Sequence, residues 1–151
     1  MLRRHLLLSA TLLPAAARAA TPTWTLVTVD EARRSMAMGP VSLPRAIAPP
    51  DAPAIEVIAP HDPDKPLSSP LTIKVMFKPQ PGASIAVKTF QALYGFFNID
   101  ITSRLLEHAK VTPDGLEADS VNIPAGEHRV TLQIADNQGR VGTRTFKFVV
   151  A

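Results

Sequence analysis

Cysteine is absent from this chain of 151 residues, so no disulfide can hold its fold. Aromatic residues are also few, with one Trp, one Tyr and six Phe. The structure must therefore depend on a core of aliphatic and phenyl side chains. About 130 residues remain once an N-terminal segment is set aside, which suits one domain that buries roughly two-thirds of its unfolded surface.

Long apolar runs are missing as well. The run from Leu6 to Leu13 is much shorter than the ~20 residues of a membrane-spanning helix. It follows a charged start and precedes small residues, with an A-x-A pattern at Ala17–Ala19, which is typical of an export signal. We predict a signal peptide over residues 1–19, cleaved near Ala19, in a periplasmic or secreted protein without a membrane span. Twin arginines at Arg3-Arg4 keep both the twin-arginine route and ordinary secretion open.

The rest of the chain has no excess of positive charge. The whole sequence has 16 Lys and Arg against 13 Asp and Glu, but Arg3, Arg4 and Arg18 belong to the predicted signal. Without them the two signs balance at 13 each, and no run of like charges remains. We therefore expect no nucleic-acid partner, because the main electrostatic support for one is lost.

Proline is concentrated in the segment Met38–Pro53, where five of sixteen residues are proline. This density predicts an extended linker. Ahead of it, Trp24, Leu26 and Val29 predict a short strand that a weak helix follows, so residues 20–53 form an N-terminal arm and linker. Two interpretations stay open: a flexible arm, or an arm whose Trp24 docks onto the following domain or a partner, because a lone tryptophan is an efficient interface anchor.

From Ala54 onward, short alternating segments are separated by Pro, Gly and Asp turns at intervals of about ten residues, which is typical of an all-β sandwich. In the clearest strand Leu71, Ile73, Val75 and Phe77 share one face. The chain ends in a predicted hairpin around the turn Asp136–Gly139, whose Asp and Gly suit a tight turn. The predicted strands are Ala54–Ala59, Leu71–Lys78, Ser84–Tyr94, one carrying His128, Val130, Leu132 and Ile134 on one face, and one carrying Arg144, Phe146, Phe148 and Val150.

The pattern P-x-G-x-H-x-V-x-L-x-I-x-D-x-x-G, from Pro124 to Gly139, resembles the closing hairpin of immunoglobulin-like (Ig-like) domains in bacterial exported proteins. The resemblance extends to SPLTIKVMF, which ends at Phe77, and to NIDIT at Asn98–Thr102. It implies an Ig-like antiparallel β-sandwich of about seven strands over residues 54–151, from a branch without the Cys, Trp, Cys core. These motifs are structural and indicate no particular function.

Asp100, Ser103 and His108 supply the residue types of a hydrolase triad within nine positions. A serine nucleophile needs a base, an orienting group and oxyanion donors brought together by the fold, and closeness in sequence supplies none of these. The chain also lacks a G-x-S-x-G elbow. We predict no catalytic residue here and expect Asp100 to cap a turn; residues 103–110 fit either a helix or a strand.

Metal sites have two candidates. Asp62 and Asp64 could bind calcium, but a lone D-x-D in a proline-rich loop indicates a turn. The hairpin also resembles that of periplasmic copper-binding sandwich proteins, for which imidazole and thioether ligands are suitable. Histidines are missing where that family has them, at the mature N-terminus and in the hairpin turn, and His128 occupies the corner where sandwiches place a Tyr that bonds back to the backbone. The copper candidates are His61, His108, His128, Met36 and Met38.

Polar residues on the strand surfaces predict either an ordinary solvated face or a mildly basic plate for a protein or an acidic envelope glycan. We predict no catalytic, cofactor-binding or metal-ligating residue, and expect an exported non-enzymatic binding or structural accessory module. The alternatives are a periplasmic copper-binding protein and, third, a small hydrolase. The residues of the plate are Lys74, Lys78, Arg129, Thr131, Gln133, Thr143, Thr145 and Lys147.

Overall fold

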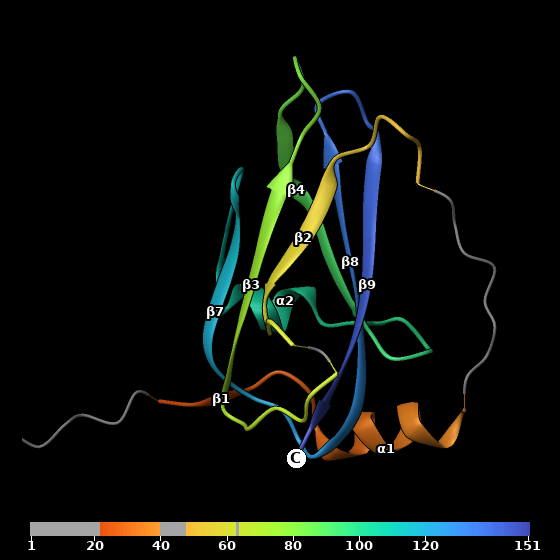
Figure 1. Ribbon diagram of the computed structural model, residues 1–151, viewed down its shortest axis with the longest axis vertical. Coiled ribbons are helices and arrows are strands. Elements are labelled where there is room, and N and C mark those ends of the chain that lie inside the picture. The colour runs from red at the N-terminus through yellow and green to blue at the C-terminus, as the bar shows by residue number, and fades with distance from the viewer. Residues whose placement is uncertain (1–21, 40–47, 63) are drawn as a thin grey trace, which may run out of the picture.

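The computed structural model describes residues 22–39, 48–62 and 64–151, which form two β-sheets packed face to face (Figure 1). The prediction of an all-β sandwich is confirmed. The described residues contain nine strands and two helices. The predicted signal peptide and part of the proline-rich linker lie outside them. No helix in the described ranges is long and apolar enough to cross a membrane.

The first sheet has the strand order β1-β7-β3-β2, with β6 paired to the same strand, β7, as β1. Strand β1 runs parallel to β7, and the other pairs are antiparallel. Its strands are β1 (Trp24–Thr25), β2 (Ala54–Ala59), β3 (Leu71–Lys78), β6 (Lys110–Thr112) and β7 (Gly115–Asn122).

The second sheet has the order β5-β4-β8-β9 and is antiparallel throughout. The last two strands form the predicted hairpin, with an unbroken register from Gly126 opposite Val150 to Ala135 opposite Val141. Its strands are β4 (Ile85–Tyr94), β5 (Ile99–Asp100), β8 (Gly126–Asp136) and β9 (Val141–Val150).

The core lies between the sheets and follows the period-two patterns. On β3 the predicted row from Leu71 to Phe77 is buried, whereas Thr72, Met76 and Lys78 are exposed. The row on β8 is buried as predicted, but the row on β9 is interrupted, because Arg144 is exposed. Since β9 is an edge strand, a long charged side chain there reaches water at the side of the sheet.

The hairpin turn uses the predicted chemistry. Asp136 Oδ1 accepts bonds from the backbone N–H groups of Gln138 and Arg140, both at 3.0 Å, and Oδ2 accepts one from Arg140 Nε at 2.7 Å. Gly139 adopts a φ of 78°, which favours glycine. Burial alone would raise the pKa of Asp136, but these bonds outweigh it and hold that pKa below its usual range.

The segment left open between helix and strand contains both. Helix α2 (Thr102–Leu106) comes first, and strand β6 starts at Lys110. Asp100 caps the turn as expected, since its Oδ1 accepts a 2.9 Å bond from the backbone N–H of Thr102. Hydrogen bonding to the side chain of Thr102, and next to its backbone N–H, lowers the pKa of Asp100.

The N-terminal arm is docked onto the sandwich. Helix α1 (Val29–Ala37) lies across the lower end of the sandwich in Figure 1. Val29 was expected in a strand, but it begins the helix, because Thr28 and Glu31 form a capping box that fixes the helix start there. Leu26 and Val27 are each 1% exposed and belong to the core.

Candidate functional site

Two side chains, Trp24 of the arm and Arg104 of the body, fasten the arm to the body. Trp24 Nε1 donates a 2.9 Å hydrogen bond to the carbonyl oxygen of Asp119, and its ring stacks on His108 with centroids 4.4 Å apart. Arg104 Nη1 donates to the carbonyl oxygen of Leu26 at 2.6 Å and to Glu31 Oε2 at 2.9 Å. The hydrogen bond from Arg104 lowers the pKa of Glu31 to about 2. Of the two interpretations of the arm, the structure therefore supports the docked one, and Trp24 docks onto the domain that follows it in the chain.

The three triad-type residues have separate structural roles. Asp100 accepts a bond from the backbone N–H of Thr102 in the turn before α2, and the carbonyl oxygen of Ser103 accepts a helix bond from Glu107 N–H at 3.1 Å. The ring of His108 is covered by Trp24. No described hydrogen bond joins any two of the three side chains, so the structure does not assemble them.

His128 takes part in a buried hydrogen-bonded chain and is only 2% exposed. Its Nε2 lies 2.7 Å from the carbonyl oxygen of Pro124, and its Nδ1 lies 2.8 Å from the hydroxyl of Tyr94. A carbonyl only accepts, so Nε2 carries the proton and Tyr94 donates to Nδ1. The predicted bond from the corner position back to the backbone is confirmed.

Burial sets the protonation of this chain. It lowers the pKa of His128, against the opposing effect of the bond to Pro124. It also raises the pKa of Tyr94 to about 12, an effect that the nearby charge of Glu31 increases and a hydrogen bond with Ser35 reduces. Both groups are therefore neutral at pH 7, and both ring nitrogens of His128 are already bonded.

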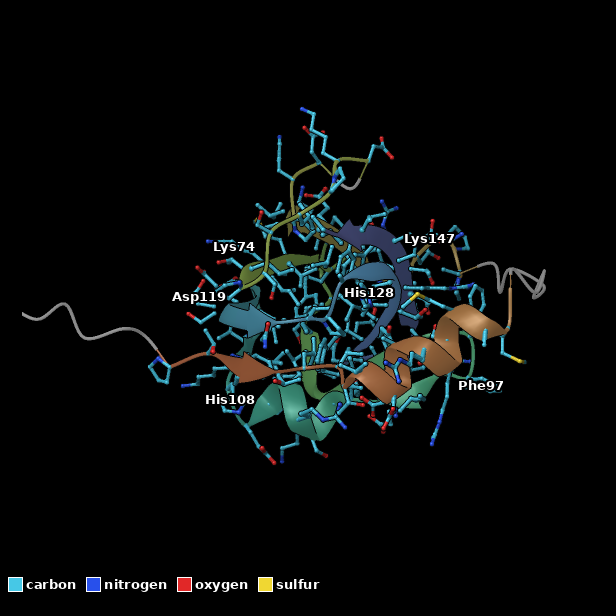
Figure 2. All side chains as sticks on the ribbon, turned by 90° about the horizontal axis from the view of Figure 1, so that it is seen from below. Lys74, Phe97, His108, Asp119, His128 and Lys147 are labelled. Carbon is cyan, nitrogen blue, oxygen red and sulfur yellow. The ribbon has the colours of Figure 1, made fainter. Side chains whose placement is uncertain are left out.

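Of the copper candidates, Met36 and His128 line one cavity, whereas His108 lies elsewhere. Figure 2 shows His108 beside α2 and His128 in the interior of the sandwich. Among the described residues, no three His, Cys, Asp or Glu side chains gather as a metal site requires. Asp62 belongs to a turn, as predicted: its carbonyl oxygen accepts from Lys65 N–H at 3.2 Å, and its carboxylate pairs with Lys65 Nζ at 2.9 Å.

Of the two interpretations of these strand surfaces, the single basic plate is wrong, because its residues belong to different sheets. Lys74 and Lys78 lie on the outer face of β3, whereas the other six lie on β8 and β9 of the second sheet. Figure 2 shows Lys74 and Lys147 on opposite sides of the molecule. Each β3 lysine pairs across strands, Lys74 with Glu117 at 3.0 Å and Lys78 with Glu56 at 2.7 Å.

A cavity of about 620 Å³ opens where α1 meets the second sheet. Helix α1 contributes Ser35 and Met36, the turn between β4 and β5 contributes Phe96, and the hairpin contributes its floor. Two glycines let the helix approach: a Cβ at Gly95 would lie 2.7 Å from Ser35 Oγ, and one at Gly126 would lie 2.7 Å from Met36 Cε. The hairpin residues in the lining are Glu127, His128, Arg129, Lys147, Phe148 and Val149.

Arg129 and Lys147 face each other across the β8–β9 ladder in this cavity. The Arg129 guanidinium also lies 5.2 Å from the ring centroid of Phe96. All thirteen Asp and Glu residues lie in the described ranges, and none forms an ion pair with either cation. Like charges directly opposite each other in a sheet are destabilising, so this pair does not contribute to the fold.

Large apolar side chains near the cavity are exposed to water. Met36 is 43% exposed and Met38 at the end of α1 is 48% exposed, while Phe97, beside Phe96, is 54% exposed. Figure 2 shows Phe97 near the C-terminal end of α1. Sequence reasoning missed both phenylalanines as site residues. The available signal was their place in the segment Gly95–Asn98, where a tight turn cannot bury two adjacent rings.

No protein-family model, curated protein or solved structure matches this chain.

Proposed function

We propose that this chain is an exported Ig-like domain that binds a protein ligand in the cavity beneath α1 and performs no catalysis. Strand order supports the Ig-like assignment. The first sheet runs β2-β3-β7-β6, which corresponds to the A-B-E-D sheet of that fold, and β4-β8-β9 corresponds to C-F-G, with β5 added beside C. His128, which bonds back to Pro124, occupies the corner at the start of strand F.

The export part of the proposal is supported by the sequence. Residues 1–19 have the charged start, apolar run and small-residue end of a signal peptide. The body that follows balances its charges and buries an extensive core, so it requires no disulfide for stability. We place the protein in the periplasm on this basis.

One observation carries the binding function: the cavity combines two cations that have no ion-pair partner with a rim of exposed methionine and phenylalanine. Exposed apolar groups beside such a hollow are typical of an interaction site. The polar residues considered as catalytic or metal-binding candidates have structural roles instead: Asp62 and Asp100 form hydrogen bonds in turns, and His128 bonds back to the backbone at the corner of the sandwich. A protein ligand would cover the rim and offer an acceptor to the two cations that have no ion-pair partner.

Site-specific photo-crosslinking tests this function with a matched pair of positions. A diazirine amino acid replaces either Met36, in the cavity, or Met76, on the outer face of the other sheet, and the two side chains are 43% and 41% exposed. After irradiation of cells that export the protein, position 36 should give a discrete protein adduct and position 76 should not. Equal labelling at the two positions, or none at position 36, would remove the proposal.

A further inference from the structure

The two adjacent cations of the cavity, Arg129 and Lys147, indicate the chemistry of the ligand, given the binding function proposed above. Arg129 and Lys147 occupy directly opposite positions on β8 and β9, and both line the cavity. On the other sheet, Lys74 and Lys78 are each neutralised by a glutamate on a neighbouring strand. The fold thus pairs both lysines of β3 and leaves the two adjacent cations of β8 and β9 without an ion pair.

The contact with Phe96 restrains the Arg129 guanidinium in an orientation that suits the binding of a planar anion. The guanidinium carbon lies 5.2 Å from the centroid of the Phe96 ring, within the range of a cation–π contact. A guanidinium held over a ring keeps its N–H groups in its own plane, where a carboxylate can accept two of them side by side. Lys147, as a neighbouring point charge, adds attraction without demanding a particular geometry.

One part of the cavity is apolar and could hold an apolar side chain of a ligand. Phe148 and Val149 lie in the floor and Met36 forms a wall. Methionine adapts its shape to different apolar partners, which is why it is common on peptide-binding surfaces. A leucine, methionine or aromatic side chain next to an acidic one would therefore occupy both parts of the site.

Two carboxylates in the lining limit how much negative charge the ligand carries. Asp64, from the loop between β2 and β3, and Glu127, on β8, are both exposed and both line the cavity. They repel a densely charged polyanion such as an acidic glycan more strongly than they repel a single carboxylate, because the repulsion grows with the charge of the ligand. We propose that the cavity binds a protein segment in which an acidic side chain lies next to a large apolar one.

A random peptide array probes this proposal directly. The labelled wild-type protein should bind peptides enriched in Asp or Glu adjacent to Leu, Met, Phe or Trp. The double variant Arg129→Gln/Lys147→Gln should bind those peptides about tenfold less tightly, because it removes the charge-assisted bonds. The matched control Lys74→Gln/Lys78→Gln removes the same charge from the opposite face and should bind within about twofold of the wild type.

Three outcomes would overturn the proposal. The first is a set of bound peptides without acidic enrichment, and the second is an equal loss of binding in the two double variants. The third is binding to an acidic polysaccharide that needs Arg129 and Lys147 while no peptide is enriched, which would assign a glycan instead. A specific crosslink from position 36 without acidic enrichment would keep the binding function and reject this ligand class, so the two proposals fail separately.

Discussion

The closing hairpin and the N-terminal arm are joined to the same sandwich in different ways. The hairpin strands β8 and β9 follow each other in sequence, pair without a bulge and bury alternate side chains in the core. The arm pairs only two residues with β7, and its hydrogen bonds to the body that involve a side chain join residues 73 to 95 positions apart. The structure of the hairpin is therefore specified by residues close together in the sequence, whereas the position of the arm depends on residues far away in the sequence.

The strongest test of the comparison removes a core side chain of the hairpin. Phe148 is 2% exposed and packs on Phe146 and His128 with ring centroids 5.7 and 5.4 Å away. Phe148→Ala should lower the free energy of unfolding by about 3–5 kcal/mol. Urea denaturation followed by circular dichroism measures this, with Val141→Ala, at an exposed position on the same strand, as the control. Similar losses in both variants would contradict a core role for the hairpin.

A smaller effect is expected from the arm. Trp24→Ala removes a hydrogen bond of about 1 kcal/mol and an aromatic stack of about 1 kcal/mol, so the arm should detach more readily. Amide exchange should then become faster in α1 and remain slow in β8 and β9. Trp24→Phe keeps a ring against His108 but loses the hydrogen bond, and should show an intermediate change. Equally accelerated exchange in α1 and the hairpin would show that arm and body form one cooperative unit.

The smallest effects are expected from acid, because the titratable groups of the hairpin and of the arm lose their stabilising contributions in different pH ranges. Burial depresses the pKa of His128 below 6.5, so the native state binds fewer protons than the unfolded chain as pH falls through 6.5. Stability is therefore complete above pH 6.5 and declines below it, by at most about 1.4 kcal/mol per pH unit. This decline precedes the titration of Glu31, Asp100 and Asp136, whose pKa values are all lowered.

The arm should respond in a lower window. Because the Arg104 bond holds the pKa of Glu31 at about 2, against 4.5 for a free side chain, its stabilisation is present above pH 4.5 and disappears as pH falls toward 2. Urea titrations from pH 7 to 3 measure both windows. Glu31→Gln should remove the share of the lower contribution that Glu31 supplies and leave the shares of Asp100 and Asp136, and His128→Gln should remove the upper contribution. A wild-type curve that stays flat from pH 6.5 to 4.5 would exclude the neutral, buried state of His128.

Much of the fold was predictable because its information is local. The bounds of β2 and β3 matched the prediction, since alternating side chains with Pro and Gly stops specify a strand without reference to anything distant. The turn at Asp136 and the corner bond of His128 to Pro124 also connect residues within four positions. Arg144 departed from the pattern because sequence alternation does not reveal which strand lies at an edge.

The candidate site was not predictable in the same way. Met36, Phe96 and Arg129 lie on a helix, a turn and a strand, and only the packing of α1 against Gly95 and Gly126 brings them together. The sequence by itself determined an all-β body with a core that needs no disulfide, because period-two burial and turn residues act over a few positions. Tertiary structure alone decided which cations remain unpaired, because charge pairing depends on distances between strands that the sequence does not contain.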